Sequence, residues 1–200
     1  MAVTANITIS VDGCVTGPED GPGRGLGVGG ERLHHWVFGG PWTYEGERHG
    51  SPTGDDASWL DAATARLGAV ICGRWTYESA GHWGGMNPWG VPVFVVTHRP
   101  EEEPAGSGFT FVSGVDEAVR RAREAADSSG KDVSVMGGAD VIRQALEAGL
   151  VDLLTIIVAP VILGGGKRLF EGFARSVDLE HVTVRQSRYA TFIEYRVRRS

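Results

Sequence analysis

The chain has 200 residues, of which 42% are hydrophobic, and this is enough apolar material for one α/β domain that buries its own core. Its formal net charge of −6 gives no overall attraction to nucleic acid or to an anionic membrane, so an anionic ligand must be bound by a local site. The most apolar stretch, residues 153–163, is far shorter than the roughly 20 residues of a membrane-spanning helix. Residues 1–6 show no basic segment that leads into an apolar one, so we expect a cytoplasmic protein.

Six short runs of apolar and β-branched residues predict strands, at 7–11, 69–72, 93–97, 109–112, 133–136 and 153–158. Most of these runs are apolar throughout, which is typical of strands buried on both faces of a sheet. Near the C-terminus, apolar and polar residues instead alternate over 182–185 and 193–197. That pattern predicts a half-buried antiparallel hairpin that closes one side of the sheet.

Helical patterns lie between the predicted strands. The clearest covers 115–126, where an apolar stripe opposes a charged face and Ser113 with Asp116 forms a capping box. Two shorter patterns predict helices over 59–67 and over 141–146, the latter ending near Gly149. Because strands and helices alternate, the central sheet should be largely parallel and the chain should form one domain over 1–200.

The segment from 18 to 54 has little regular pattern and is expected to be a long irregular insertion, functional or mobile. Thirty glycines are concentrated at 21–30, 81–90, 137–138 and 164–166, which indicates loops that turn sharply or approach a ligand closely. Cys14 and Cys72 are too few and too far apart for a zinc site, so we expect no metal and interpret both as packing residues. The acidic run 101–103 is interpreted as a solvated loop.

Two junctions between a strand and a helix are candidate phosphate sites. At the first, a buried strand ends at Gly73 and a helix opens with Arg74 and Thr76, so unpaired N–H groups and a cation could meet a phosphate. At the second, Gly137 and Gly138 let the backbone pass close to a pyrophosphate, although the Gly-x-Gly-x-x-Gly spacing is absent. A tight strand-to-helix turn is the alternative for each junction.

A third strand end delivers a hydroxyl, an imidazole and a guanidinium together, at Thr97, His98 and Arg99. This trio suits a phosphate monoester such as the ribose 2′-phosphate of NADP, because arginine offers fixed paired donors. A solvated loop is the alternative.

Five segments in this order resemble the dihydrofolate reductase superfamily, most closely the RibD C-terminal reductase domain of riboflavin biosynthesis and its stand-alone bacterial relatives. They are the strand that enters Asp12-Gly13, the Gly-Arg-x-Thr-x-Glu element at 73–78, Val96-Thr97, Gly137-Gly138, and the run 159–166 that leads into Leu169-Phe170. The resemblance covers nearly the whole chain. It implies a three-layer α/β/α fold that binds NADPH at the carboxyl ends of a mainly parallel sheet, a homodimer, and hydride transfer to a pterin or a pyrimidine-linked sugar imine.

The resemblance also implies roles for single residues. The residues expected to hold the pyrophosphate and the adenosine side of the cofactor are Gly73, Arg74 and Thr76. The residues expected to present backbone groups to the pyrophosphate, through a cis Gly-Gly peptide, are Gly137, Gly138, Ala139 and Asp140. Those expected around the 2′-phosphate are Thr97, His98 and Arg99, and those expected to line the nicotinamide are Thr8 and Val15. Lys167 and Arg168 are candidates for binding a substrate phosphate, and a solvated basic turn is their alternative.

The proton donor is not identified by the resemblance. Dihydrofolate reductases place a carboxylate on the helix after the first long loop, where this chain has Arg32, with Glu31 one residue away. The candidates are therefore Glu31, His34 and His35, and because adjacent helical residues point about 100° apart, at most one histidine should face a pocket. Surface histidines are the alternative. Four tryptophans, at 36, 42, 83 and 89, could form a flat aromatic pocket, although core packing is the alternative for Trp36.

The sequence thus predicts an NADPH-dependent reductase that acts on a small pyrimidine- or pterin-like substrate, similar to a 5-amino-6-(5-phosphoribosylamino)uracil reductase. A true dihydrofolate reductase and a non-catalytic NADP(H)-binding module are the alternatives. No nucleic-acid or membrane partner is expected.

Overall fold

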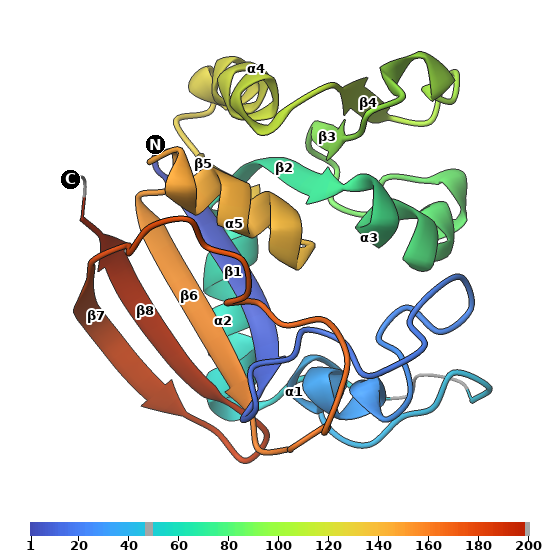
Figure 1. Ribbon diagram of the computed structural model, residues 1–200, viewed down its shortest axis with the longest axis vertical. Coiled ribbons are helices and arrows are strands. Elements are labelled where there is room, and N and C mark those ends of the chain that lie inside the picture. The colour runs from blue at the N-terminus through green and yellow to red at the C-terminus, as the bar shows by residue number, and fades with distance from the viewer. Residues whose placement is uncertain (47–49, 199–200) are drawn as a thin grey trace.

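A sheet of eight strands forms the centre of the computed structural model, in which residues 1–46 and 50–198 are described (Figure 1). The strands are β1 (Val3–Ser10), β2 (Leu67–Gly73), β3 (Val93–Val96), β4 (Phe109–Val112), β5 (Asp132–Val135), β6 (Leu153–Ala159), β7 (Leu179–Gln186) and β8 (Thr191–Val197). Their order across the sheet is β4-β3-β2-β5-β1-β6-β8-β7.

The first six strands pair in parallel, and β8 pairs antiparallel with both β6 and β7. The prediction of a mainly parallel sheet with an antiparallel C-terminal hairpin is therefore confirmed. Within the hairpin only β8 is partly buried, because β7 forms the outer edge and exposes Leu179, Val182 and Val184. The expected homodimer stays a prediction.

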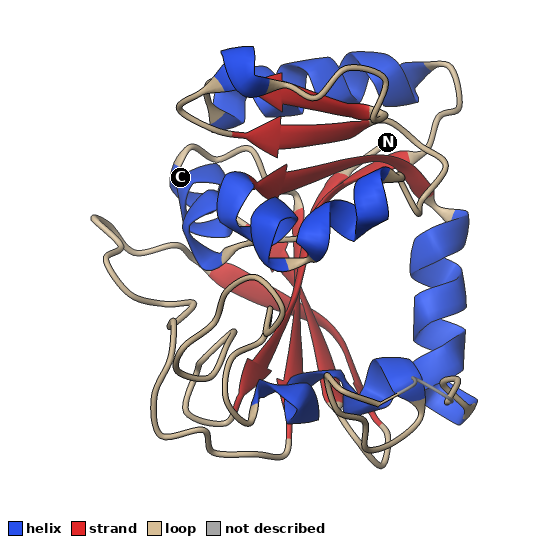
Figure 2. Cartoon of the chain, turned by 90° about the vertical axis from the view of Figure 1, so that its right-hand side faces the viewer, coloured by secondary structure: helices blue, strands red, loops and turns tan. Residues whose placement is uncertain are grey.

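Helices cover both faces of the sheet, which gives the predicted three layers. On one face α4 (Val115–Asp127) and α5 (Ala139–Glu147) share a core with apolar residues of β1, β2, β5 and β6. On the other face lie α1 (His35–Phe38), α2 (Gly54–Ala65) and α3 (Arg74–Ser79), and α2 is the upright helix at the right of Figure 2. Short 3-10 turns occur at η1 (Gly30–His34), η2 (Gly81–Gly85) and η3 (Pro100–Glu102).

β1 shows how the two faces differ. Val3, Ala5 and Ile9 belong to the core beneath α4 and α5. Because successive side chains of a strand point to opposite faces, Thr4, Asn6 and Thr8 lie on the α2 side. One face of the central sheet is therefore apolar, whereas the other carries hydroxyl and amide groups.

α4 starts at Val115 as predicted, but its predicted cap and the predicted end of the helix over 59–67 are wrong. The capping box at Ser113 is absent, because α4 starts at Val115 with Gly114 in the N-cap position and no side chain caps it. Burial of Val115 sets this start and leaves Ser113 outside the helix and exposed. The second helix ends at Ala65, and Leu67 instead pairs with Asp132 as the first residue of β2.

The insertion from 18 to 54 is irregular, as predicted, apart from η1 and α1 over the residues that the structure describes there. Cys14 and Cys72 are buried free thiols, and burial raises the pKa of the Cys72 thiol to about 12, so it packs as a neutral side chain. None of the helices within 1–46 and 50–198 combines the length and the apolar character that crossing a membrane requires. Over the same residues, His, Cys, Asp and Glu side chains form no group that could hold a metal ion.

Candidate active site

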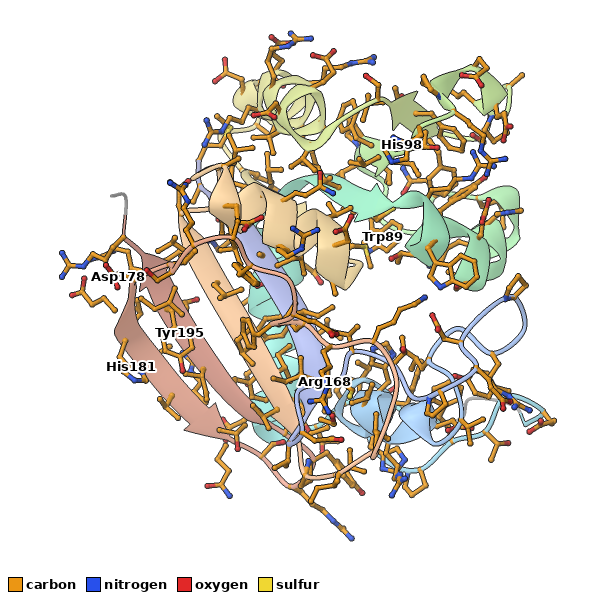
Figure 3. The ribbon with its side chains drawn as sticks, viewed as in Figure 1. Trp89, His98, Arg168, Asp178, His181 and Tyr195 are labelled. Atoms are coloured by element: carbon orange, nitrogen blue, oxygen red, sulfur yellow. The ribbon has the colours of Figure 1, made fainter. Side chains whose placement is uncertain are left out.

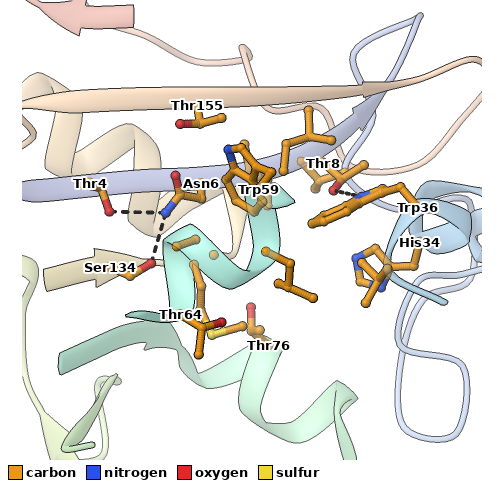
Figure 4. Close-up of a pocket in the computed structure, with 18 of the residues that line it drawn as sticks. Thr4, Asn6, Thr8, His34, Trp36, Trp59, Thr64, Thr76, Ser134 and Thr155 are labelled. Atoms are coloured by element: carbon orange, nitrogen blue, oxygen red, sulfur yellow. Dashed lines mark hydrogen bonds between the residues drawn. The ribbon is translucent and has the colours of Figure 1, made fainter. Parts of the chain in front are cut away.

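A cavity of about 950 Å³ lies between α2 and the polar face of the sheet (Figure 4). Its floor carries polar side chains from three adjacent strands, namely Thr4, Asn6, Thr8, Ser134 and Thr155. Ala62, Ala63 and Thr64 of α2 line it from the opposite side. These short side chains leave space between helix and sheet, so a small molecule can lie along the floor.

Hydrogen bonds fix the floor of this larger cavity. The Asn6 amide nitrogen donates to the hydroxyls of Thr4 and Ser134, each at 3.2 Å. The strand register places Asn6 beside Thr155, and Thr155 beside Glu194 of β8, which also lines the cavity. A ligand here therefore meets a row of hydrogen-bonding groups that crosses the strands.

Aromatic side chains form a second part of the lining. The buried indole of Trp36 donates a 3.1 Å hydrogen bond to the Thr8 hydroxyl and packs edge-on against Trp59 and Phe192. Trp36, Trp42, Trp83 and Trp89 all line this cavity, but in separate groups, because Trp42 packs against Phe38 and Tyr44 and Trp83 packs against Trp89. Trp36 also belongs to a core cluster, so it lines the cavity and packs in the core at the same time.

The η1 turn within the insertion brings one proton-donor candidate to the larger cavity. His34 lines it (Figure 4), whereas the other two candidates, Glu31 and His35, are not among its lining residues. His35 instead packs edge-on against Tyr189 at 6.0 Å between ring centres. Burial lowers the pKa of His35, and the nearby Arg32 charge acts in the same direction.

A second cavity of about 590 Å³, here called the groove, lies at the carboxyl ends of β2, β3 and β5. The expected cofactor residues that line it are Gly73, Arg74, Thr76, Thr97, His98, Arg99, Gly138, Ala139 and Asp140. The remaining three, Thr8, Val15 and Gly137, line the larger cavity. Thr76 and Gly138 line both, so the two cavities meet at this pair.

Glycines permit a close approach of the two strand-to-helix junctions. The N–H of Gly73 donates to the carbonyl of Gly137 at 2.7 Å, and the Gly137-Gly138 peptide is cis, as expected. A Cβ atom on Gly73 would lie 3.0 Å from a methyl carbon of Val141, and one on Gly138 would lie 3.3 Å from the Thr76 hydroxyl. Side chains at these positions would fill the place where the cavities meet.

Ion pairs occupy the basic end of the groove. The Arg74 guanidinium donates to Glu78 at 2.6 Å and to Glu102 at 2.9 Å, and it stacks over the Phe111 ring. Burial lowers the pKa of Arg74, but the hydrogen bonds to these two carboxylates outweigh burial and raise it above its ordinary value. The acidic run 101–103 is therefore not simply a solvated loop, which corrects the sequence interpretation.

The loop after β6 carries Lys167 and Arg168, and both line the groove rather than the larger cavity. Arg168, labelled in Figure 3, donates to the Asp12 carbonyl at 2.7 Å. The Asp12 carboxylate accepts from the N–H groups of Leu163 and Gly164 at 3.0 and 2.9 Å, and a hydrogen bond from Ser10 together with these two holds its pKa well below the usual range. The Asp12-Gly13 segment and the glycine-rich loop are thus tied together, and a role of Lys167 or Arg168 toward a substrate phosphate stays a prediction.

The family model described as "RibD C-terminal domain" matches residues 1–191. The chain belongs to this family. Among solved structures, a putative riboflavin biosynthesis protein from Shewanella sp. PV-4 is 20% identical with a TM-score of 0.71, and the match covers 100% of both chains. A dihydrofolate reductase from Enterococcus faecalis complexed with NADP(H) is 17% identical with a TM-score of 0.63, over 98% of this chain and 96% of that one.

A pyrimidine reductase-like protein from Corynebacterium diphtheriae is 15% identical with a TM-score of 0.61, over 100% of this chain and 92% of that one. At these identities the likeness shows a dihydrofolate-reductase-like fold. The uncharacterized protein YyaP of Bacillus subtilis is 39% identical over 56 residues, which is 28% of this chain and 30% of that protein.

For this RibD C-terminal family member, the sequence predicted Thr8 but none of the other floor residues of the larger cavity, and it did not predict the α2 side. The signal for the floor was present, because polar residues alternate through Thr4, Asn6 and Thr8. On α2 the apolar pattern of Trp59, Ala62 and Ala63 predicted the helix, and these residues do line the cavity, but the pattern does not show whether they face a ligand or a packed core.

Proposed function

We propose that this protein is an NADPH-dependent reductase that transfers hydride to a small heteroaromatic substrate of pyrimidine or pterin type. The observation that carries the proposal is the junction at Thr76 and Gly138, where a groove with basic strand ends meets a cavity with aromatic walls and a polar floor. A reductase needs such a junction, because the cofactor and the substrate must meet in one enclosed place.

The groove residues fit a dinucleotide phosphate cofactor. Gly138 leaves open a path that a Cβ atom would narrow, and α5 begins at the next residue, so N–H groups of its first turn have no partner within the helix. The Nη1 atom of Arg74 is buried without a hydrogen-bond partner in the described part of the chain. The sequence assigned Arg74 to the pyrophosphate side, but its shared contact with Glu102 brings it beside Arg99. Arg74 and Arg99 would therefore take the ribose 2′-phosphate together, with Thr97 and His98 beside them.

When bound, NADPH supplies the hydride. The chain's own residues orient the substrate and exclude water from it. Thr8 fixes the Trp36 indole, so the aromatic wall holds a flat ring, while Asn6 and Thr155 offer hydrogen bonds to its polar edge. His34 is the proton-donor candidate that reaches the larger cavity, and an imidazole there can deliver a proton to a ring nitrogen.

Cofactor titration and a substrate panel test this proposal. NADPH should bind more tightly than NADH, and Arg99→Ala should weaken NADPH binding by roughly tenfold or more, since a hydrogen bond to a charged group contributes about 1.5–3 kcal/mol. NADH binding should stay unchanged. Arg120→Ala is the matched control, because Arg120 has a similarly exposed side chain, 55% against 56%, and lines neither cavity.

The same panel, followed by absorbance at 340 nm, separates the alternatives. Oxidation of NADPH with a pyrimidine or pterin substrate supports the proposal, and equal affinity for NADPH and NADH contradicts the assignment of Arg99. Tight NADPH binding without turnover of any substrate would instead favour a non-catalytic binding module.

A further inference from the structure

Two guanidinium groups of the groove are already paired with carboxylates. Arg74 donates to Glu78 at 2.6 Å and to Glu102 at 2.9 Å. Arg99 donates to Glu102 at 3.2 Å and lies 3.9 Å from Glu78. Two positive and two negative charges therefore meet at the end of the groove that lies beside Thr97 and His98, and in sum they offer an anion little attraction.

Glu102 is the bridging residue of this network. One of its carboxylate oxygens accepts from Arg74 and the other from Arg99. A phosphate monoester would use these same donors, because its oxygens also accept from neighbouring guanidinium groups. Glu102 thus competes, in charge and in hydrogen bonds, with the group that the two arginines would otherwise bind.

The local structure holds Glu102 beside the arginines and outside the groove itself. Arg74 and Arg99 line the groove, whereas Glu102 is not among its lining residues. Glu102 ends η3, and the next residue fixes this turn because the Glu103 carboxylate accepts from the N–H of Phe111 at 2.6 Å. A ligand can therefore enter the groove while the Glu102 charge stays close to the arginines.

Glu78 and Glu102 have different origins. Glu78 is on the same helix as Arg74, four residues away, and belongs to the Gly-Arg-x-Thr-x-Glu element. Glu102 comes from a separate loop, 28 residues from Arg74. A change at Glu102 can therefore alter the charge of the groove without altering the strand-to-helix junction.

We propose that Glu102 is a specificity-determining residue that weakens the preference of the groove for a ligand with a 2′-phosphate over the same ligand without it. Its negative charge repels the phosphate and reduces the charge that Arg74 and Arg99 present, whereas a neutral 2′-hydroxyl is little affected. This inference rests on the proposed function in taking the groove as the cofactor site.

Adenosine 2′,5′-bisphosphate and adenosine 5′-phosphate are suitable probes, because they differ only in the 2′-phosphate and need no turnover. The variant is Glu102→Gln, which keeps the size of the side chain and removes its charge. The matched control is Glu101→Gln, which makes the same change of net charge at an adjacent, exposed residue. Affinities are measured by calorimetry at low salt, and thermal unfolding confirms that each variant is folded.

Glu102→Gln should bind the bisphosphate about tenfold more tightly than the parent protein and bind the 5′-phosphate equally well. Glu101→Gln should change both affinities by about twofold or less. The gain from Glu102→Gln should shrink at about 1 M salt, where the screening length falls to about 3 Å.

Unchanged or weaker binding of the bisphosphate to Glu102→Gln would overturn the inference, because Glu102 would then only hold the arginines in place. An equal gain for both probes would overturn it as well, since the effect would not depend on the 2′-phosphate. If Glu102→Gln shows the predicted gain but no substrate is reduced, the proposed function fails and this inference stands. If neither probe binds to any of the proteins, both are wrong.

Discussion

The indole N–H of Trp75 donates a 2.6 Å hydrogen bond to the Asp20 carboxylate, which also binds the Lys167 ammonium at 2.6 Å. The ammonium lies over the Trp75 ring, 4.3 Å from its centre. Asp20 therefore connects the insertion to α3 and to the glycine-rich loop. Its own side chain is 10% exposed, whereas Lys167 and Trp75 are each 47% exposed, so water reaches these contacts from the side of the two partners.

Asp20→Ala should loosen the insertion. Losing both contacts should cost about 1 kcal/mol of local stability, which corresponds to about fivefold faster tryptic cleavage after Arg24 in the same segment. Glu45→Ala, at an exposed residue elsewhere in the insertion, is the control and should leave the rate unchanged. Equal cleavage rates for Asp20→Ala and the parent protein would show that the contacts do not hold the segment.

Gly138→Ala should weaken NADPH binding and leave the fold intact. The new Cβ atom would lie 3.3 Å from the Thr76 hydroxyl, which can shift slightly, but it would narrow the place where the two cavities meet. We expect at least a tenfold loss of NADPH affinity, corresponding to about 1.4 kcal/mol, with an unchanged circular dichroism spectrum. Gly21→Ala is the control, since its Cβ would meet only the Trp75 ring, at 3.9 Å. Full retention of NADPH binding would mean that Gly138 serves the turn alone.

Asp56→Asn should stabilise the protein at neutral pH. Asp56 is 4% exposed and its Oδ1 atom is buried without a hydrogen-bond partner in the described residues. Burial raises the pKa of Asp56 above its ordinary value, although a hydrogen bond with Ser187 opposes this. The stability linked to its proton is therefore fully present below the unfolded pKa of about 3.9 and is lost as the pH rises through the folded pKa.

Urea unfolding at several pH values measures this effect. The free energy of unfolding of Asp56→Asn should exceed that of the parent protein at pH 7, and the difference should vanish near pH 3. Asp61→Asn, on the exposed side of α2, is the control and should show no such pH-dependent gain. A loss of stability at pH 7 would mean that the ionised carboxylate is favourable where it lies.

Dihydrofolate should be a poor substrate. Neither Glu31 nor Arg32 is among the residues that line the larger cavity, so η1 and α1 bring no carboxylate to a protonated pterin there. Turnover with NADPH should be absent or feeble. A kcat of about 1–10³ s⁻¹ that is lost on Glu31→Gln but kept on Glu45→Gln would identify a true dihydrofolate reductase instead.

The parallel part of the sheet could be predicted because its strands are short apolar runs that alternate with helical patterns. In α4 the apolar stripe is strong, and its residues Val115, Ala118 and Ala122 are buried as expected. The apolar stripe does not identify the capping residue, because the start of a helix also depends on which side chains are buried in the core. For Ser113 the local pattern was correct, but burial of Val115 decided the outcome.

Part of the groove could be predicted because the close approach of two strand ends requires glycines, and these glycines can be recognised in the sequence. The pairing of Glu102 with Arg74 has no such sign in the sequence, since it depends on the path of a loop 28 residues away. The role of α2 was hidden for a similar reason. Ala62 and Ala63 belong to the apolar pattern that predicts this helix, but such a pattern is the same whether small residues pack in a core or leave space for a ligand.

The sharing of Thr76 and Gly138 by both cavities has a consequence for divergence within the family. A substitution at either residue changes the groove and the larger cavity together, so neither cavity can be altered there alone. The far side of the larger cavity is different, because residues of α2, β7 and β8 line it and none of them lines the groove. Under the proposed function, exchanging side chains of that helix and hairpin would therefore change the substrate, while the groove stays as it is.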